Sequence, residues 1–173
     1  MGLKVGNVKL EPYDTNWKNM FEEEKKCLQN LFKELAIAIE HIGSTSIEGL
    51  SAKPIIDIAV GVNELKDFQK IRHYFECEPY SIKIDSYCDE ILVRKGSEEN
   101  RTHFIHVMEI DSQRYKNTIL FRDYLKSHTE YLKEYENLKK TLAEKYADNR
   151  KKYTDSKNEF IQKVLVLAER EIL

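Results

Sequence analysis

The sequence predicts an α+β fold, in which helices flank a mixed β-sheet and a C-terminal helical hairpin packs against or beside that sheet. Helix-like and strand-like patterns follow one another in the order helix, strand, loop, strand, helix, strands and helices, and residues 55–62 form a nearly continuous apolar run. A chain of 173 residues with 41% hydrophobic side chains can also build a real core. We therefore expect a single domain over 1–173, with 114–173 as a C-terminal helical subregion.

The first helix is expected over residues 14–35, because apolar side chains recur there every three or four residues. Asp14 or Thr15 is placed to cap its free amide groups. Residues 37–42 follow as a strand, and the next segment, GSTSIEGLSAKP, is rich in small and hydroxyl-bearing residues typical of a loop. The apolar positions of the helix are Trp17, Phe21, Leu28, Leu31, Phe32 and Leu35.

The middle of the chain holds strands and one further helix. The run at 55–62 is rich in β-branched residues and carries one charge, Asp57, as expected of a central strand. Asn63 can cap a helix over 64–75. Three more strands are expected, at residues 80–84, 91–94 and 102–109.

The last third of the chain is helical in pattern from Asn117 onward. A break or kink is expected near 127–129. The sequence Ser156-Lys-Asn-Glu159 satisfies the capping-box pattern and predicts the start of the last helix. Its apolar face comprises Phe160, Ile161, Val164, Leu165 and Ala168.

The charge of the chain is unevenly distributed. Residues 1–113 carry 14 Lys and Arg against 20 Asp and Glu (net −6), whereas residues 114–173 carry 14 against 10 (net +4). An excess this small is typical of solvated helix faces, so a nucleic-acid partner is not expected.

Cysteine usage and hydropathy bear on the compartment. Cys27, Cys77 and Cys88 are odd in number and lack a CxxC spacing, which suggests neither a disulfide framework nor a structural zinc site. No apolar run approaches the length needed to span a bilayer. We expect a cytoplasmic protein without a membrane partner, and the sequence does not indicate an oligomeric state.

The segment that carries chemistry is a Gly-Ser turn followed by a charged residue in an apolar strand. Gly43 lets the backbone approach a phosphate closely, and the hydroxyl groups of Ser44 and Thr45 can donate to its oxygens. Asp57 is costly in an apolar strand unless it binds a metal ion or a partner group. The alternative is an ordinary turn and a hydrogen-bonded core carboxylate, paired with Lys53.

Five stretches of the chain carry a family likeness: HIGSTSIEGLSAKPIIDIAVGV, VKLEPYDTNW before it, and THFIHV, FRDYLKSH and YTDSKNEFI after it. On these stretches the chain resembles the GrpB-like family of uncharacterised bacterial proteins, over residues 8–168. That family is similar in fold to the DNA polymerase beta-like nucleotidyltransferases. The resemblance therefore implies a nucleotidyltransferase-like fold.

The resemblance also implies roles for particular residues. In such nucleotidyltransferases a Gly-Ser pair holds the triphosphate and two alternating carboxylates bind divalent metal, which would make Gly43 and Ser44 phosphate contacts and Asp57 a ligand of Mg²⁺ or Mn²⁺. The second carboxylate should stand at residue 59, which is Ala59. This departure leaves it open whether the chain is an enzyme.

Further candidates surround this core motif. The later acid of the family pattern has several candidates, Glu90, Glu109, His103 and His106, among which Glu90 is taken as catalytic and His103 and His106 as metal ligands. On a strand these two histidines point to opposite faces, and ordinary hydrogen-bonded histidines are the alternative. Lys53 could neutralise a phosphate. Additional candidates, each with an alternative role in packing or ion pairing, are His41, Arg122, Arg150, Tyr153 and Lys157.

Three functions are compatible with these residues. The first is metal-dependent nucleotidyl or phosphoryl transfer to a small molecule. The second is a non-catalytic module that binds a nucleotide, a coenzyme or another phosphorylated small molecule; domains of the family also occur fused to dephospho-CoA kinase, which associates them with coenzyme A metabolism. The third is a protein that contacts RNA or a protein partner through the basic C-terminal helices.

Overall fold

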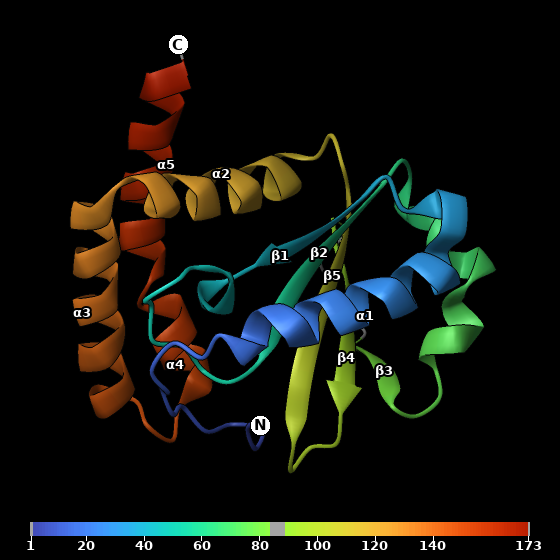
Figure 1. Cartoon of the computed structure of the whole chain (residues 1–173), viewed down its shortest axis with the longest axis horizontal. Helices are drawn as coiled ribbons and strands as arrows, with labels where there is room; N and C mark the ends of the chain where they lie inside the picture. Colours follow the sequence, from blue (N-terminus) through green and yellow to red (C-terminus); the bar gives the residue numbers. More distant parts are fainter. Residues whose placement is uncertain (1, 84–88, 173) are drawn as a thin grey trace.

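The computed structural model describes residues 2–83 and 89–172, so that residue 84 of a predicted strand and Cys88 lie outside the described residues. It confirms the α+β class, with a five-stranded mixed sheet and helices on both sides (Figure 1). The central strand β2 pairs antiparallel with β1 and parallel with β5. The strands are β1 (Ala38–Ile42), β2 (Ile56–Val62), β3 (Tyr80–Lys83), β4 (Ile91–Gly96) and β5 (Arg101–Glu109), in the spatial order β1-β2-β5-β4-β3.

Alternate side chains of β2 face two different layers. Ile56, Ile58 and Val60 are buried against α1, whereas Ala59 packs with Tyr115 of α2 on the other face. The α1 helix runs across one face of the sheet, and the C-terminal helices gather at the β1 side of the molecule (Figure 1). The helices are α1 (Asn16–Phe32), α2 (Gln113–Ser127), α3 (Thr129–Lys145), α4 (Arg150–Asp155) and α5 (Asn158–Ile172).

The predicted helix over 64–75 is wrong in type. The chain forms two short 3₁₀ segments there, Leu65–Lys70 and Arg72–Phe75, and the N-cap position of the first is Glu64, without a side-chain cap, rather than Asn63. Leu65, Phe68 and Ile71 pack on the core at a spacing of three residues, which suits three residues per turn better than the α-helical period.

The described part of the C-terminal region contains four helices, α2 to α5, rather than the two of the predicted hairpin. The break near 127–129 is confirmed, since α2 ends at Ser127 and α3 begins at Thr129. The α2 helix begins at Gln113 rather than Asn117, because the hydroxyl of Ser112 accepts the amide of Tyr115. The α4 helix was not expected, and α5 begins two residues after Ser156.

The helical region is joined to the sheet through the loop that follows β1. Leu50 and Ile47 of that loop are buried among side chains of α2, α3 and α5.

None of the helices in the described part of the chain is long and apolar enough to cross a membrane. Cys27 and Cys77 are free and exposed.

Candidate functional site

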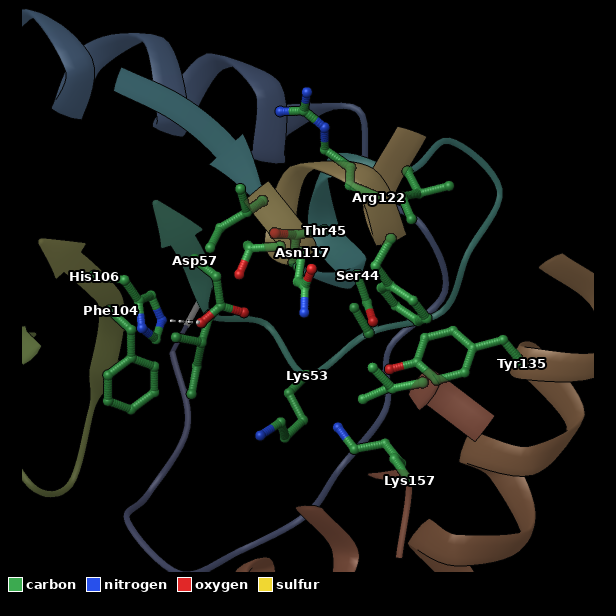
Figure 2. Close-up of a pocket in the computed structure, with 18 of the residues that line it drawn as sticks. Ser44, Thr45, Lys53, Asp57, Phe104, His106, Asn117, Arg122, Tyr135 and Lys157 are labelled. Atoms are coloured by element: carbon green, nitrogen blue, oxygen red, sulfur yellow. Dashed lines mark ion pairs between the residues drawn. The ribbon is translucent and has the colours of Figure 1, made fainter. Parts of the chain in front are cut away.

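A cavity of about 590 Å³ lies between the sheet and the C-terminal helices. Its walls come from the turn after β1, from β2 and β5, and from all four C-terminal helices. Figure 2 shows Asp57, Ser44, Lys53 and Lys157 around the open space. Residues that are far apart in the sequence therefore share this site.

The turn at Gly43 strongly favours glycine. Gly43 has φ +67°, and a Cβ atom at this position would lie 2.5 Å from Oδ2 of Asp57. The hydroxyl of Ser46 donates to the Gly43 carbonyl at 2.7 Å and stabilises the turn. The turn thus packs directly against the Asp57 carboxylate.

His41 contacts this turn on the α1 side, and it does not line the cavity. Its Nε2 lies 3.0 Å from the hydroxyl of the buried Thr45, and its ring stacks on Phe21 of α1 at 4.7 Å. Burial lowers the pKa of His41 to about 4, so its ring is neutral. Thr45, predicted as a phosphate contact, already bonds this histidine.

Ser44 points into the cavity toward Tyr135 of α3 (Figure 2). Burial raises the pKa of the Tyr135 phenol, although its hydrogen bond to Ser44 opposes the shift. A pair of neutral hydroxyl groups therefore lines this part of the cavity.

Asp57 is the first of a row of charged side chains that contact one another at the edge of the cavity. His106 of β5 lies opposite Ala59 in the register, with Nε2 3.6 Å from Asp57 Oδ1 and Nδ1 2.5 Å from Glu90 Oε1. Burial opposes protonation of His106, but the two carboxylates outweigh it and raise its pKa to about 9. Arg114 of α2 continues this row, because its guanidinium forms an ion pair with Glu90 at 3.0 Å.

The Asp57 carboxylate stays ionised. Burial opposes its ionisation, yet His106, Lys53 and Arg150 together hold the pKa of the carboxyl below its usual range. Its side chain remains 33% exposed, so it is open to the cavity.

Three cations face Asp57 without pairing tightly to any carboxylate. Among the described residues, Lys53, Arg150 and Lys157 form no ion pair within 4.0 Å. Instead the amines of Lys53 and Lys157 lie over the ring of Tyr153, at 5.5 and 4.6 Å, and Arg150 lies 4.8 Å from the centre of the Phe104 ring. These aromatic rings hold the cations in the cavity wall.

The positive charges of these residues repel one another, which makes the protonated form of each amine less favourable. Burial, followed by the charges of Arg150 and Lys157, lowers the pKa of Lys53 to about 7. Burial and Arg150 likewise lower the pKa of Lys157 to about 8, although Asp57 opposes the shift. A bound anion would relieve this repulsion, because it would favour the protonated form of both amines.

Arg122 lines the cavity but does not join the three cations, and His103 does not line the cavity. Arg122 donates to Glu40 at 2.8 Å and to the carbonyl of His41 at 2.9 Å, and its guanidinium points away from the cavity (Figure 2). It therefore anchors α2 to β1. His103 lies on the α1 face of the sheet, buried, and contacts Thr102 at 2.9 Å.

Sequence reasoning missed several residues of the cavity wall. Arg114, Asn117, Thr118 and Phe121 line the cavity from one side of α2. Their spacing of three or four residues places them on one helix face. Starting the helix at the Ser112 cap would have grouped them, whereas Tyr135 carries no sequence signal beyond its place in an amphipathic helix.

The resemblance implies Mg²⁺ or Mn²⁺, for which Asp57, Glu90 and His106 are the candidate ligands at the cavity. Asp57 and Glu90 are bridged by a protonated His106, which would have to lose its proton to bind a metal, and Ala59 supplies no ligand. The described residues hold no group of three or more His, Cys, Asp or Glu that could bind a metal ion. In this arrangement His106 occupies the carboxylate oxygens that a divalent ion would need, and the cations beside them favour an anion.

Comparison with known proteins extends the likeness to a solved structure. A family profile described as GrpB protein matches residues 7–166. The glutamate-rich protein GrpB of Alkalihalophilus pseudofirmus is 38% identical over 95% of this chain and 98% of that protein. The UPF0157 protein YqkA of Bacillus subtilis is 35% identical over 90% of this chain but only 45% of its own length. The crystal structure of conserved protein GrpB from Enterococcus faecalis matches with a TM-score of 0.87 and 34% identity, over 95% of this chain and 99% of that one.

Proposed function

The chain belongs to the GrpB family, and from its cavity we propose that it binds a phosphorylated small molecule, such as a nucleotide, a coenzyme or a sugar phosphate. The observation that carries this proposal is the cluster of Lys53, Arg150 and Lys157. Cations held on aromatic rings without tight carboxylate partners are suited to the oxygens of a phosphate group.

The rest of the cavity suits the remainder of such a ligand. A cavity of about 590 Å³ is within the range of small-molecule sites. Phe121, Ile161 and Leu165 provide apolar surface beside the charged end. A ligand with one anionic end and a larger, partly apolar body would use both parts of the wall.

A second candidate is metal-dependent nucleotidyl or phosphoryl transfer, as in the nucleotidyltransferases that the family resembles. It is favoured by the direct contact between the Gly43 turn and Asp57, which join the phosphate and metal positions of that pattern. It requires that metal binding displaces the proton of His106. Dependence of ligand binding on Mg²⁺ separates it from the first candidate.

The test is a thermal-shift panel of nucleoside triphosphates, coenzyme A, dephospho-coenzyme A and sugar phosphates, each with and without Mg²⁺ or Mn²⁺. A ligand at about a hundredfold its dissociation constant should raise the melting temperature by about 5–10 °C in a chain of this size. Replacing Lys157 by Met should cut the affinity at least about tenfold, since it removes one charge-assisted contact. The ligand-free variant should be no less stable than the original, because it loses a half-buried charge that Arg150 repels.

Lys152→Met is the matched control, because Lys152 is an exposed lysine of the neighbouring α4 helix. It should leave the affinity unchanged. Equal losses in the two variants would show that ligand binding depends only on overall charge, and the absence of any ligand-induced shift across the panel would overturn the proposal.

A further inference from the structure

Asp57 shares the cavity with the three cations. Its charge acts on Lys53, Arg150 and Lys157, favouring the protonated form of each. An anion held by these cations would therefore lie in the field of an ionised carboxylate.

An ionised carboxylate only accepts hydrogen bonds. A phosphate ester is largely a dianion at neutral pH, and its oxygens are acceptors as well, so the two groups repel each other. Oδ1 of Asp57 is directed at His106, and Oδ2 lies against the Gly43 backbone. The carboxylate is nevertheless 33% exposed, and it needs a donor on the cavity side.

The surroundings decide which donor fits. An ammonium group on the ligand would meet Lys53, Lys157 and the protonated His106, all of the same charge. A hydroxyl group donates without adding charge. Asn117 and Thr118, which also line the cavity, are neutral polar side chains able to bond further hydroxyl groups.

We propose that Asp57 accepts a hydrogen bond from a hydroxyl group of the bound molecule, so that the cavity selects phosphate esters of polyols over phosphate esters without hydroxyl groups. This inference rests on the proposed function and names its ligand class: sugar phosphates and the ribose phosphates of nucleotides. Asp57 is thereby a specificity determinant, and the cations supply most of the affinity.

The test compares ribose 5-phosphate with n-pentyl phosphate by titration calorimetry, with and without Mg²⁺. Both are five-carbon phosphate monoesters, and only the first has hydroxyl groups. The original protein should bind ribose 5-phosphate about tenfold more tightly or better, because the alkyl ester leaves Asp57 without a donor. This comparison needs no variant and stands even where a substitution impairs folding.

Asp57→Asn sharpens the test, because it removes the charge and keeps the shape. The variant should bind n-pentyl phosphate more tightly than the original does and ribose 5-phosphate less tightly, so that the preference falls to about threefold or less. Asp155→Asn, an exposed aspartate of α4, should leave the preference unchanged.

The outcomes separate the inference from the proposed function. Equal binding of the two esters by the original protein would overturn the inference while leaving phosphate binding intact. Binding that requires Mg²⁺ and is lost for both esters in Asp57→Asn would overturn it in favour of a metal role. Failure to bind either ester, together with an unresponsive ligand panel, would remove the proposed function itself.

Discussion

The contact between Gly43 and Asp57 joins the turn to the sheet at the scale of single atoms. Two independent constraints act on the same glycine: a left-handed backbone conformation and a carboxylate where a Cβ atom would stand. The second constraint ties the position of Asp57 to the course of the turn. The turn then presents Ser44 to the cavity, while Thr45 is held by His41.

Gly43→Ala tests this contact. We expect a loss of about 2–4 kcal/mol in the free energy of unfolding, because the methyl group adds a clash with Asp57 to the backbone strain. Gly49→Ala is the matched control: Gly49 has φ +80° but nothing within 4 Å of the added carbon, so it should lose only about 1 kcal/mol. Urea unfolding of both variants gives the comparison, and equal losses would show that the Asp57 contact costs nothing.

At the scale of elements, hydrophobic patterning predicted most of the sheet and α1. The apolar run of β2 is buried as expected, and its single charge stands at the cavity. The α4 helix could not be predicted, because six residues are too few to show a period. In the sequence Arg150 and Lys157 are candidates with ion pairing on a helix surface as the alternative, and their packing against Phe104 and Tyr153 places them in the cavity wall.

The α1 helix is fixed to the far side of the sheet by a buried charge that patterning did not reveal. Glu24 is 2% exposed; it pairs with Lys95 of β4 and accepts a hydrogen bond from the Tyr80 hydroxyl at 2.8 Å. An ionised carboxylate at this depth depends on its cation. The ion pair therefore ties α1 to β4, and the Tyr80 hydrogen bond ties it to β3.

Lys95→Met should destabilise the protein by about 3–5 kcal/mol, because it leaves the Glu24 carboxylate buried without its cation. Adding Glu24→Gln should restore much of the loss, since a neutral amide still accepts the Tyr80 hydrogen bond. Lys4→Met breaks an exposed pair with Glu99 and should cost at most about 1 kcal/mol. Chemical denaturation of the single and double variants measures these values, and a Lys95→Met loss as small as that of Lys4→Met would contradict the assigned role.

At the scale of the whole molecule, the cavity joins the acidic and basic parts of the chain. Asp57 and its carboxylate neighbour Glu90 come from the part with net charge −6, and Arg150 and Lys157 from the part with net charge +4. The loop that carries Leu50 and Ile47 packs the two parts together next to the cavity. The net charge of the whole chain is only −2, yet Lys53, Arg150 and Lys157 concentrate positive charge in the cavity wall.

Because the two lysines lie in the cavity wall, we expect ligand binding to be coupled to the uptake of protons. The pKa of Lys53 is lowered to about 7 and that of Lys157 to about 8, so at pH 8 the free protein holds Lys53 mostly neutral and Lys157 about half protonated. A phosphate group favours the charged form of both, so on binding the two amines should together take up about one proton or more at pH 8 and almost none at pH 6. Because protons are taken up, affinity should fall as the pH rises from 7 to 9.

Calorimetric titration of ribose 5-phosphate at pH 8, in buffers of different ionisation enthalpy, measures the number of protons taken up. The ligand contributes none itself, since its phosphate has a second pKa of about 6 and is already a dianion at pH 8. Lys53→Met should reduce the uptake by most of one proton while keeping part of the affinity, because Arg150 and Lys157 remain. Binding without proton uptake would show that the phosphate lies away from these two amines, and the anionic end of the ligand would then have to be placed elsewhere in the cavity.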